Sequence, residues 1–162
     1  MKAAAFLPRT KSRLVFVLVM ASYCMATRAV LRAVVNAFGA EPIRLGSLVQ
    51  HGHPILEAVS LLLLGPIVES LILIGMVEFL HWLRSPSWLE VSLPAILSAA
   101  LHLPVSHAVV VAPSWFIMAW AYLFWRRVSW KVGFAVIASI HALLNLTPAI
   151  SVISYAVHHS NA

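Results

Sequence analysis

Apolar residues fill five long runs of this chain, and short polar stretches separate them. The runs extend over about 14–38, 54–83, 88–103, 108–125 and 132–157, the third being the shortest. About 20 apolar residues in helical conformation cross the hydrocarbon core of a bilayer. Because the connections are short, consecutive helices are expected to lie antiparallel. The pattern predicts an all-α fold, namely a polytopic transmembrane helical bundle with about five spans.

Composition supports a membrane protein with a single domain. Hydrophobic residues make up 62% of the chain and charged residues 10%, and the mean hydropathy is +0.94. A soluble domain carries about 25% charged residues. The 162 residues are too few for two membrane domains, so one transmembrane domain over 1–162 is expected. Cys24 is the only cysteine, which excludes an internal disulfide and a thiolate metal site.

Basic residues predict the orientation of the bundle. Eight of the eleven Lys and Arg residues fall on one side of the membrane if five spans are assumed: Lys2, Arg9, Lys11, Arg13, Arg84, Arg126, Arg127 and Lys131. Of the other three, Arg44 falls in an opposite loop, and Arg28 and Arg32 lie within the first run. Since Lys and Arg concentrate in cytoplasmic loops, the N-terminus is expected inside and the C-terminus outside. The net charge of +6 therefore reflects membrane topology, and no nucleic-acid partner is expected.

Four polar residues interrupt the apolar runs at a common depth. Ionisable side chains inside a membrane are costly, so they mark functional sites by default. At 1.5 Å rise per residue, Glu69 and His102 lie about 21 Å from the cytoplasmic ends of their runs. On the same measure His141 lies about 14 Å and Asn145 about 20 Å deep. Being four residues apart, His141 and Asn145 also share a helix face. The four side chains are therefore expected to meet.

The chemistry of these residue types favours hydrolysis. A glutamate in a low-dielectric site is a competent general base for water. Two histidines can hold that water or donate to an oxyanion, and an asparagine amide adds a neutral donor. The same set suits zinc in principle, so a divalent metal stays open, although no cofactor is predicted. The His-Glu-x-x-His helix of metalloproteases is absent from the sequence.

Other polar and aromatic residues carry weaker expectations. Pro66 is expected to kink its helix and open space one turn before Glu69. Glu78 is expected near the cytoplasmic interface. His107 is expected at the external boundary, hydrated like other loop histidines. Trp115 lies deeper, where it either packs or lines a substrate groove.

In this order and on separate helices, the polar patches resemble the CPBP intramembrane protease family, also called CAAX proteases and bacteriocin-processing or Abi-like proteins. Members carry a Glu-Glu-x-x-x-Arg motif, then Phe-x-x-x-His, then His-x-x-x-Asn or His-x-x-x-Asp. The segment 66–70 looks like the first motif, His102 ends the second, and 141–145 is an intact third. The similarity covers a core of about 54–157. It implies that Glu69 activates water and that His102, His141 and Asn145 assist.

Three positions depart from the family pattern. Ser70 stands in place of the second glutamate, Ile74 in place of the arginine, and Ser98 in place of the phenylalanine. The family's second glutamate and arginine look more like supports than the attacking base. Arg28 and Arg32, one turn apart in the first run, are candidates for the missing positive charge.

The resemblance implies an intramembrane endopeptidase that cuts a membrane-anchored protein or peptide near its C-terminal anchor. Some members of the family process C-terminal sorting tails in bacteria. The expected location is the bacterial inner membrane, and the expected partners are membrane lipid and the anchored substrate. The alternative is a non-catalytic relative that binds a peptide or partner protein, as an immunity factor does. A transporter subunit is a third reading.

Overall fold

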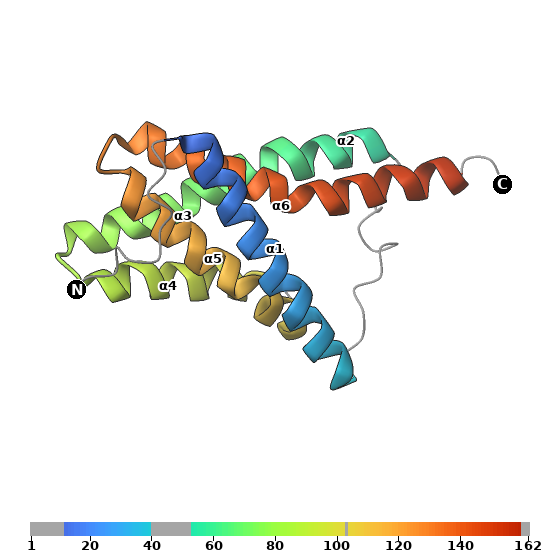
Figure 1. Cartoon of the computed structure of the whole chain (residues 1–162), viewed down its shortest axis with the longest axis horizontal. Helices are drawn as coiled ribbons and strands as arrows, with labels where there is room; N and C mark the ends of the chain where they lie inside the picture. The colour runs from blue at the N-terminus through green and yellow to red at the C-terminus, as the bar shows by residue number, and fades with distance from the viewer. Residues whose placement is uncertain (1–11, 40–52, 103, 160–162) are drawn as a thin grey trace.

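Helices make up all the regular structure in this computed structural model, which describes residues 12–39, 53–102 and 104–159 (Figure 1). They are α1 (Arg13–Ala37), α2 (Pro54–Val59), the π-helical segment η3 (Ser60–Leu64), α3 (Gly65–Trp82), α4 (Ser87–Ala100), α5 (Val105–Trp125) and α6 (Trp130–His159). Since α2, η3 and α3 follow one another without a break, they form one long helix. The predicted all-α fold is confirmed for the described residues. Lys2, Arg9, Lys11 and Arg44, which entered the topology prediction, lie outside them.

Among the described residues, four helices are long enough and apolar enough to cross a membrane. They are α1, the combined helix Pro54–Trp82, α5 and α6. The chain therefore has the architecture of a multi-pass helical membrane protein. The third predicted span is shorter than expected, because α4 has 14 residues. At 1.5 Å per residue it is about 21 Å long, less than the ~30 Å hydrocarbon core.

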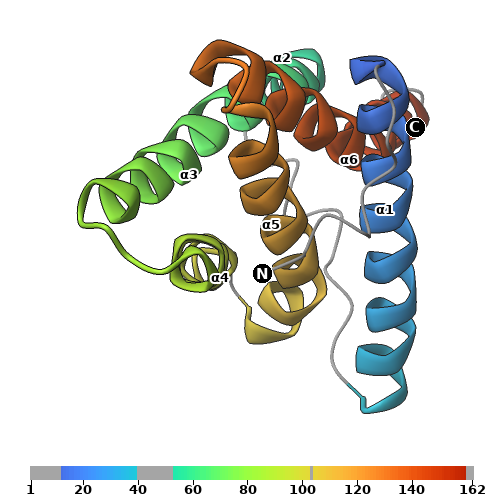
Figure 2. The same cartoon turned by 60° about the vertical axis from the view of Figure 1, so that its left-hand side comes forward.

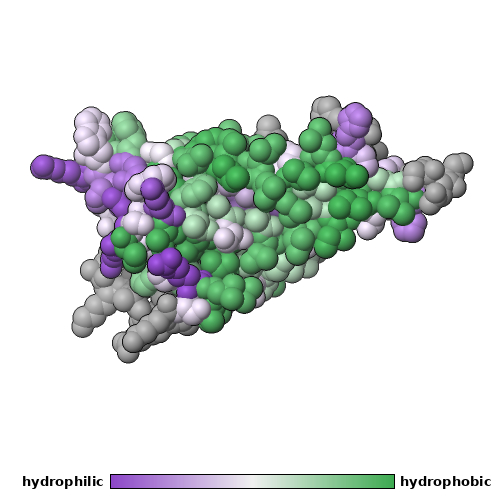
Figure 3. Space-filling view, turned by 90° about the horizontal axis from the view of Figure 1, so that it is seen from above, coloured by the Kyte–Doolittle hydropathy of each residue, from purple (hydrophilic) through white to green (hydrophobic). Residues whose placement is uncertain are grey.

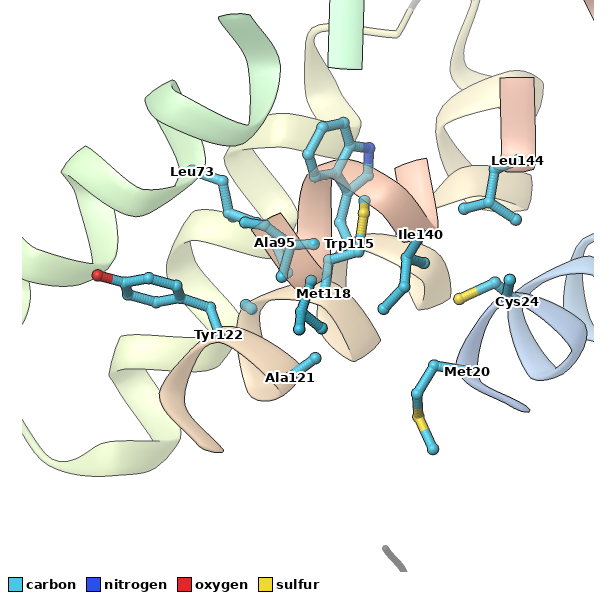
Figure 4. Packing of buried hydrophobic residues seen from close by; sticks show 14 of the residues in the cluster. Met20, Cys24, Leu73, Ala95, Trp115, Met118, Ala121, Tyr122, Ile140 and Leu144 are labelled. Atoms are coloured by element: carbon cyan, nitrogen blue, oxygen red, sulfur yellow. The ribbon is translucent and has the colours of Figure 1, made fainter. Parts of the chain in front are cut away.

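Helix α5 lies at the centre of the bundle. It packs against α1, α3, α4 and α6, and Figures 1 and 2 show it running between them. Its inward face carries large side chains with almost no exposed surface, including Trp115, Met118 and Tyr122. Figure 4 shows these side chains beside residues of α1, α3, α4 and α6, such as Cys24 and Ile140. The core is therefore built around α5, and α2 extends from it along α6.

Basic residues gather at one end of the bundle. The turn between α3 and α4 contains Arg84, and the turn between α5 and α6 contains Arg126 and Arg127. Both turns lie at the left in Figure 1, and Figure 3 shows the hydrophilic surface concentrated at that same end. The consecutive helices alternate in direction (Figure 1). This arrangement is the one expected when positively charged connections stay on the cytoplasmic side.

Ion pairs hold this charged end together. Arg126 Nη2 lies 3.1 Å from Glu78 Oε2, and the Tyr122 hydroxyl donates a hydrogen bond to the other carboxylate oxygen of Glu78. His81 Nδ1 lies 2.9 Å from Glu90 Oε1, which ties the end of α3 to α4. Glu78, expected near the interface, is thus a structural link between α3 and α5.

The π-helical segment η3 follows from the position of Pro66. Proline has no backbone N–H, and its ring clashes with the carbonyl four residues earlier, which here belongs to Leu62. The Gly65 N–H bonds to the Ser60 carbonyl, one residue further back than in an α-helix. In this register the Leu61 carbonyl would need the N–H of Pro66, which does not exist. The turn before Glu69 is therefore widened, and the Leu61 carbonyl is left for a partner outside the helix.

Candidate active site

The structure brings together three of the four polar residues predicted to meet. Glu69 on α3 lies between His102, in the turn after α4, and His141 on α6. Glu69 Oε2 is 3.6 Å from His102 Nε2 and 3.5 Å from His141 Nε2. The three elements converge because α3 packs against both α4 and α6. Both distances exceed the roughly 2.7–3.2 Å of a direct N–H···O bond, so one carboxylate oxygen faces two imidazoles at close range.

Gly65 lies beside the Glu69 carboxylate and the Ser60 carbonyl oxygen. A Cβ added at Gly65 would lie 3.5 Å from Glu69 Oε1 and 3.3 Å from the Ser60 carbonyl oxygen. The Glu69 side chain is 36% exposed, yet Oε2 itself is buried and forms no hydrogen bond with the described residues. The carboxylate is thus reachable through one oxygen while the other faces the histidines.

The short length of α4 places His102. The helix ends at Ala100, so His102 lies in a turn instead of within the helix predicted for 88–103. Its Nδ1 is 2.8 Å from the Ser98 carbonyl oxygen. A carbonyl only accepts, so Nδ1 carries a proton, and Nε2 is the ring nitrogen that faces Glu69. Ser98 stands where the CPBP motif has phenylalanine, and its backbone carbonyl is the group that orients His102.

His141 is held by Trp115, a contact that sequence reasoning left undecided. The Trp115 ring meets the His141 ring edge-on, with 5.1 Å between centroids and 83° between planes. The same indole lies 5.5 Å from the His102 ring. His141 is 3% exposed, and its Nδ1 has no hydrogen-bond partner among the described residues. Nε2 is the ring nitrogen that faces the Glu69 carboxylate, so a proton on Nε2 would point towards that carboxylate.

His107 lies closer to the site than expected. Its ring centroid is 5.9 Å from that of His102. The prediction that His107 is a hydrated loop residue is wrong, because α5 starts at Val105 and carries His107 on its first turn, half-buried beside the turn that holds His102. No feature of the sequence indicated the contact between His107 and His102, because that contact depends on where α4 ends.

Asn145 supports the backbone near the site. Its Nδ2 donates a 3.0 Å hydrogen bond to the Leu61 carbonyl oxygen, the acceptor that Pro66 leaves without a helical partner. One of its two amide N–H groups is therefore used in this hydrogen bond to η3. The structure joins Asn145 to the widened turn that precedes Glu69, and not to the Glu69 carboxylate itself.

Replacing Asn145 should mainly lower stability. Asn145→Ala removes the donor to a carbonyl inside the membrane, and an unsatisfied buried polar group costs about 1–3 kcal/mol. We expect a lower midpoint of thermal unfolding in detergent, measured by circular dichroism. Asn36→Ala, at an exposed position of α1, is the matched control. Unchanged stability together with a large loss of activity would instead assign Asn145 to the reacting atoms.

The structure distinguishes the two arginines of the first span. Arg28 is half-buried, and its Nε donates a 2.8 Å hydrogen bond to Ser114 Oγ on α5. It is close enough for its charge to act on Glu69 and on His102 and His141. Arg32 is exposed. Arg28 is therefore the cation that stands near the carboxylate.

Removing the Arg28 charge should weaken the site more than removing that of Arg32. Arg28→Ala takes away a positive charge that stabilises negative charge around Glu69, with an expected loss of roughly tenfold in rate for a partly screened charge. Arg32→Ala is the matched control and should leave the rate unchanged. The measurement is the initial rate of substrate cleavage in liposomes, with unfolding followed in parallel. Equal effects of the two changes would refute the distinction.

The family positions that depart from the pattern face the core. Ser70 is 1% exposed, and its hydroxyl has no hydrogen-bond partner among the described residues. Ile74 belongs to the hydrophobic core cluster. Charged side chains at these two positions would be buried away from water, so serine and isoleucine fit the packing present here.

No set of three or more His, Cys, Asp or Glu side chains has the geometry to hold a metal ion, as far as the described residues show. Comparison with protein-family models, with curated proteins and with solved structures finds no match for this chain. The residues of the site and their geometry therefore carry the functional argument.

Proposed function

We propose that this protein is a glutamate-dependent intramembrane endopeptidase, related to the CPBP family, that cuts a membrane-anchored protein or peptide near its C-terminal anchor. The observation that carries the proposal is the Glu69 carboxylate oxygen between the Nε2 atoms of His102 and His141. A carboxylate and two imidazoles from α3, the turn after α4 and α6, inside an apolar bundle, are costly to maintain for packing alone.

The three side chains suit complementary roles in peptide hydrolysis. Glu69 takes a proton from water, and the hydroxide oxygen bonds to the carbonyl carbon of the scissile peptide. The Nε2–H of His141 donates a hydrogen bond to the resulting oxyanion, while Nε2 of neutral His102 accepts a hydrogen bond from the O–H that stays on the attacking oxygen. When the intermediate collapses, the C–N bond breaks and the leaving nitrogen takes the proton that Glu69 holds. Atoms and charges balance without a cofactor.

The position of the site favours a substrate that is itself in the membrane. Glu69 and His141 lie within helices long enough to span a bilayer, so a peptide bond must enter the hydrocarbon region to reach them. A protein held by a transmembrane segment is already concentrated there. The bacterial inner membrane is the proposed location.

A non-catalytic binding protein is the second candidate. The observation in its favour is that Ser70 and Ile74 are buried and uncharged where related proteases carry a glutamate and an arginine. Such a protein would hold a peptide in the same place without cutting it, and it would need the shape of the site more than the Glu69 charge.

The test is cleavage by purified protein in liposomes of bacterial lipid. A panel of tagged proteins, each anchored by a C-terminal transmembrane segment, is incubated with wild-type protein and with His141→Ala, in water carrying a heavy oxygen isotope. We expect the wild type alone to release a product with the isotope in its new C-terminal carboxylate. A parallel reaction with a zinc chelator should proceed unchanged. Tight capture of an anchored protein by the wild type, without cleavage, would support the binding protein and refute the protease.

A further inference from the structure

An apolar groove on the surface of the bundle is lined by none of the candidate site residues Glu69, His102 and His141. It has a volume of about 740 Å³ and runs between α1, η3 and α6. Apolar side chains form most of its wall, namely Leu14, Val17, Leu18, Leu62, Leu63 and Leu146, among others. Leu14, Leu18, Leu63 and Leu146 are each more than 40% exposed, so the groove opens to the surrounding lipid.

Two basic residues stand in the wall of this groove. Arg13 is the first residue of α1, and Lys131 is the second residue of α6. The first turn of a helix is an unfavourable place for a cation, because the helix dipole is positive there. Neither first turn contains an acidic residue. Neither side chain forms an ion pair with a carboxylate in the part of the chain that the structure describes.

The groove thus combines an apolar wall with positive charge at one end. That end carries Arg84, Arg126 and Arg127 on neighbouring turns, which places it at the cytoplasmic headgroup region on the predicted topology. Basic pockets between transmembrane helices on that side bind anionic lipid headgroups. A volume within the roughly 300–1,000 Å³ of small-molecule sites accommodates an extended chain.

We propose that this groove is a binding site for an anionic phospholipid of the cytoplasmic leaflet. Arg13 and Lys131 hold the phosphate, and an acyl chain lies along the groove against α1, η3 and α6. Charge complementarity selects the anionic lipid, because a zwitterionic headgroup brings its own cation to the same two basic side chains. The site is independent of the proposed proteolysis.

The experiment is native mass spectrometry of the full-length protein, equilibrated in mixed micelles with equal phosphatidylglycerol and phosphatidylcholine. We expect one phosphatidylglycerol to be retained preferentially by the wild type. The double variant Arg13→Ala/Lys131→Ala should lose this preference by about thirtyfold. Arg13→Lys/Lys131→Arg should keep it. Arg84→Ala/Arg127→Ala removes two charges from the same end without touching the groove, and it should behave like the wild type.

A second variant tests the groove itself. Ser139 lines it and is exposed, so Ser139→Phe fills the groove without changing any charge. We expect this variant to lose bound phosphatidylglycerol, whereas Thr147→Phe, at an exposed position on α6 outside the groove, should retain it. Retention of the lipid by both the Arg13/Lys131 alanine variant and Ser139→Phe would overturn the proposal. A Ser139→Phe protein that keeps the lipid but no longer binds an anchored peptide would assign the groove to the peptide instead.

Discussion

Glu69→Gln should reduce peptide cleavage by roughly a hundredfold to ten-thousandfold, the range typical for loss of a general base. The glutamine amide has nearly the same size, so the positions of His102 and His141 should hold, but the amide cannot take a proton from water. The measurement is the initial rate in liposomes under single-turnover conditions, with folding checked by circular dichroism. Cleavage at the wild-type rate by folded Glu69→Gln protein would refute the proposed mechanism.

The matched control is a glutamate outside the site. Glu90 is 5% exposed and pairs with His81 at the charged end of the bundle. Glu90→Gln should leave the cleavage rate unchanged. Glu69→Asp offers a finer comparison, since it keeps the charge but withdraws it from both histidines. A displacement of about 1 Å can cost a hundredfold in rate, so this variant should also be severely impaired.

Gly133→Ala should clearly lower the stability of the bundle. A Cβ at Gly133 on α6 would lie 2.7 Å from Tyr122 Cδ2 and 3.3 Å from the Arg126 backbone nitrogen. The Tyr122 ring is fully buried and its hydroxyl is bonded to Glu78, so it cannot move aside freely. Overpacking of this kind costs about 1–3 kcal/mol. The expected result is a lower free energy of unfolding in detergent, and a looser α5–α6 contact.

Two comparisons make this prediction specific. Gly75 on α3 has open space where a Cβ would lie, so Gly75→Ala should leave stability unchanged or raise it by up to about 1 kcal/mol through helix propensity. Combining Gly133→Ala with Tyr122→Leu should cost less than the sum of the two single changes, because the smaller side chain relieves the clash. If the two losses of stability are strictly additive, the close approach of α6 to Tyr122 is not the cause of the loss in Gly133→Ala.

The positions of the candidate site residues were predictable because each stands out against its surroundings. Glu69, His102 and His141 are ionisable residues in apolar runs, and the membrane makes such residues costly. A depth estimate from the ends of the runs was enough to expect them to meet. The connection of Asn145 to Leu61 was not predictable, because it depends on the register change that Pro66 imposes on η3.

Trp115 and His107 show a different limit of the sequence. An aromatic residue inside an apolar helix has no pattern that distinguishes packing from contact with a site. Trp115 touches both His102 and His141 only because α5 runs through the centre of the bundle. His107 lies beside His102 only because α4 stops after 14 residues and turns directly into α5.

By itself the sequence determined that this protein is a helical membrane protein, where its long helices lie and which polar residues are exceptional among them. Hydrophobicity is a property of each residue and its neighbours along the chain, so local pattern suffices for these conclusions. The tertiary structure alone decided that α4 is too short to match its neighbours, that Arg28 binds Ser114 on α5 while Arg32 is exposed, and that the absence of a side chain at Gly133 lets α6 approach Tyr122. These depend on distances between helices far apart in sequence, and side-chain packing across the bundle sets those distances.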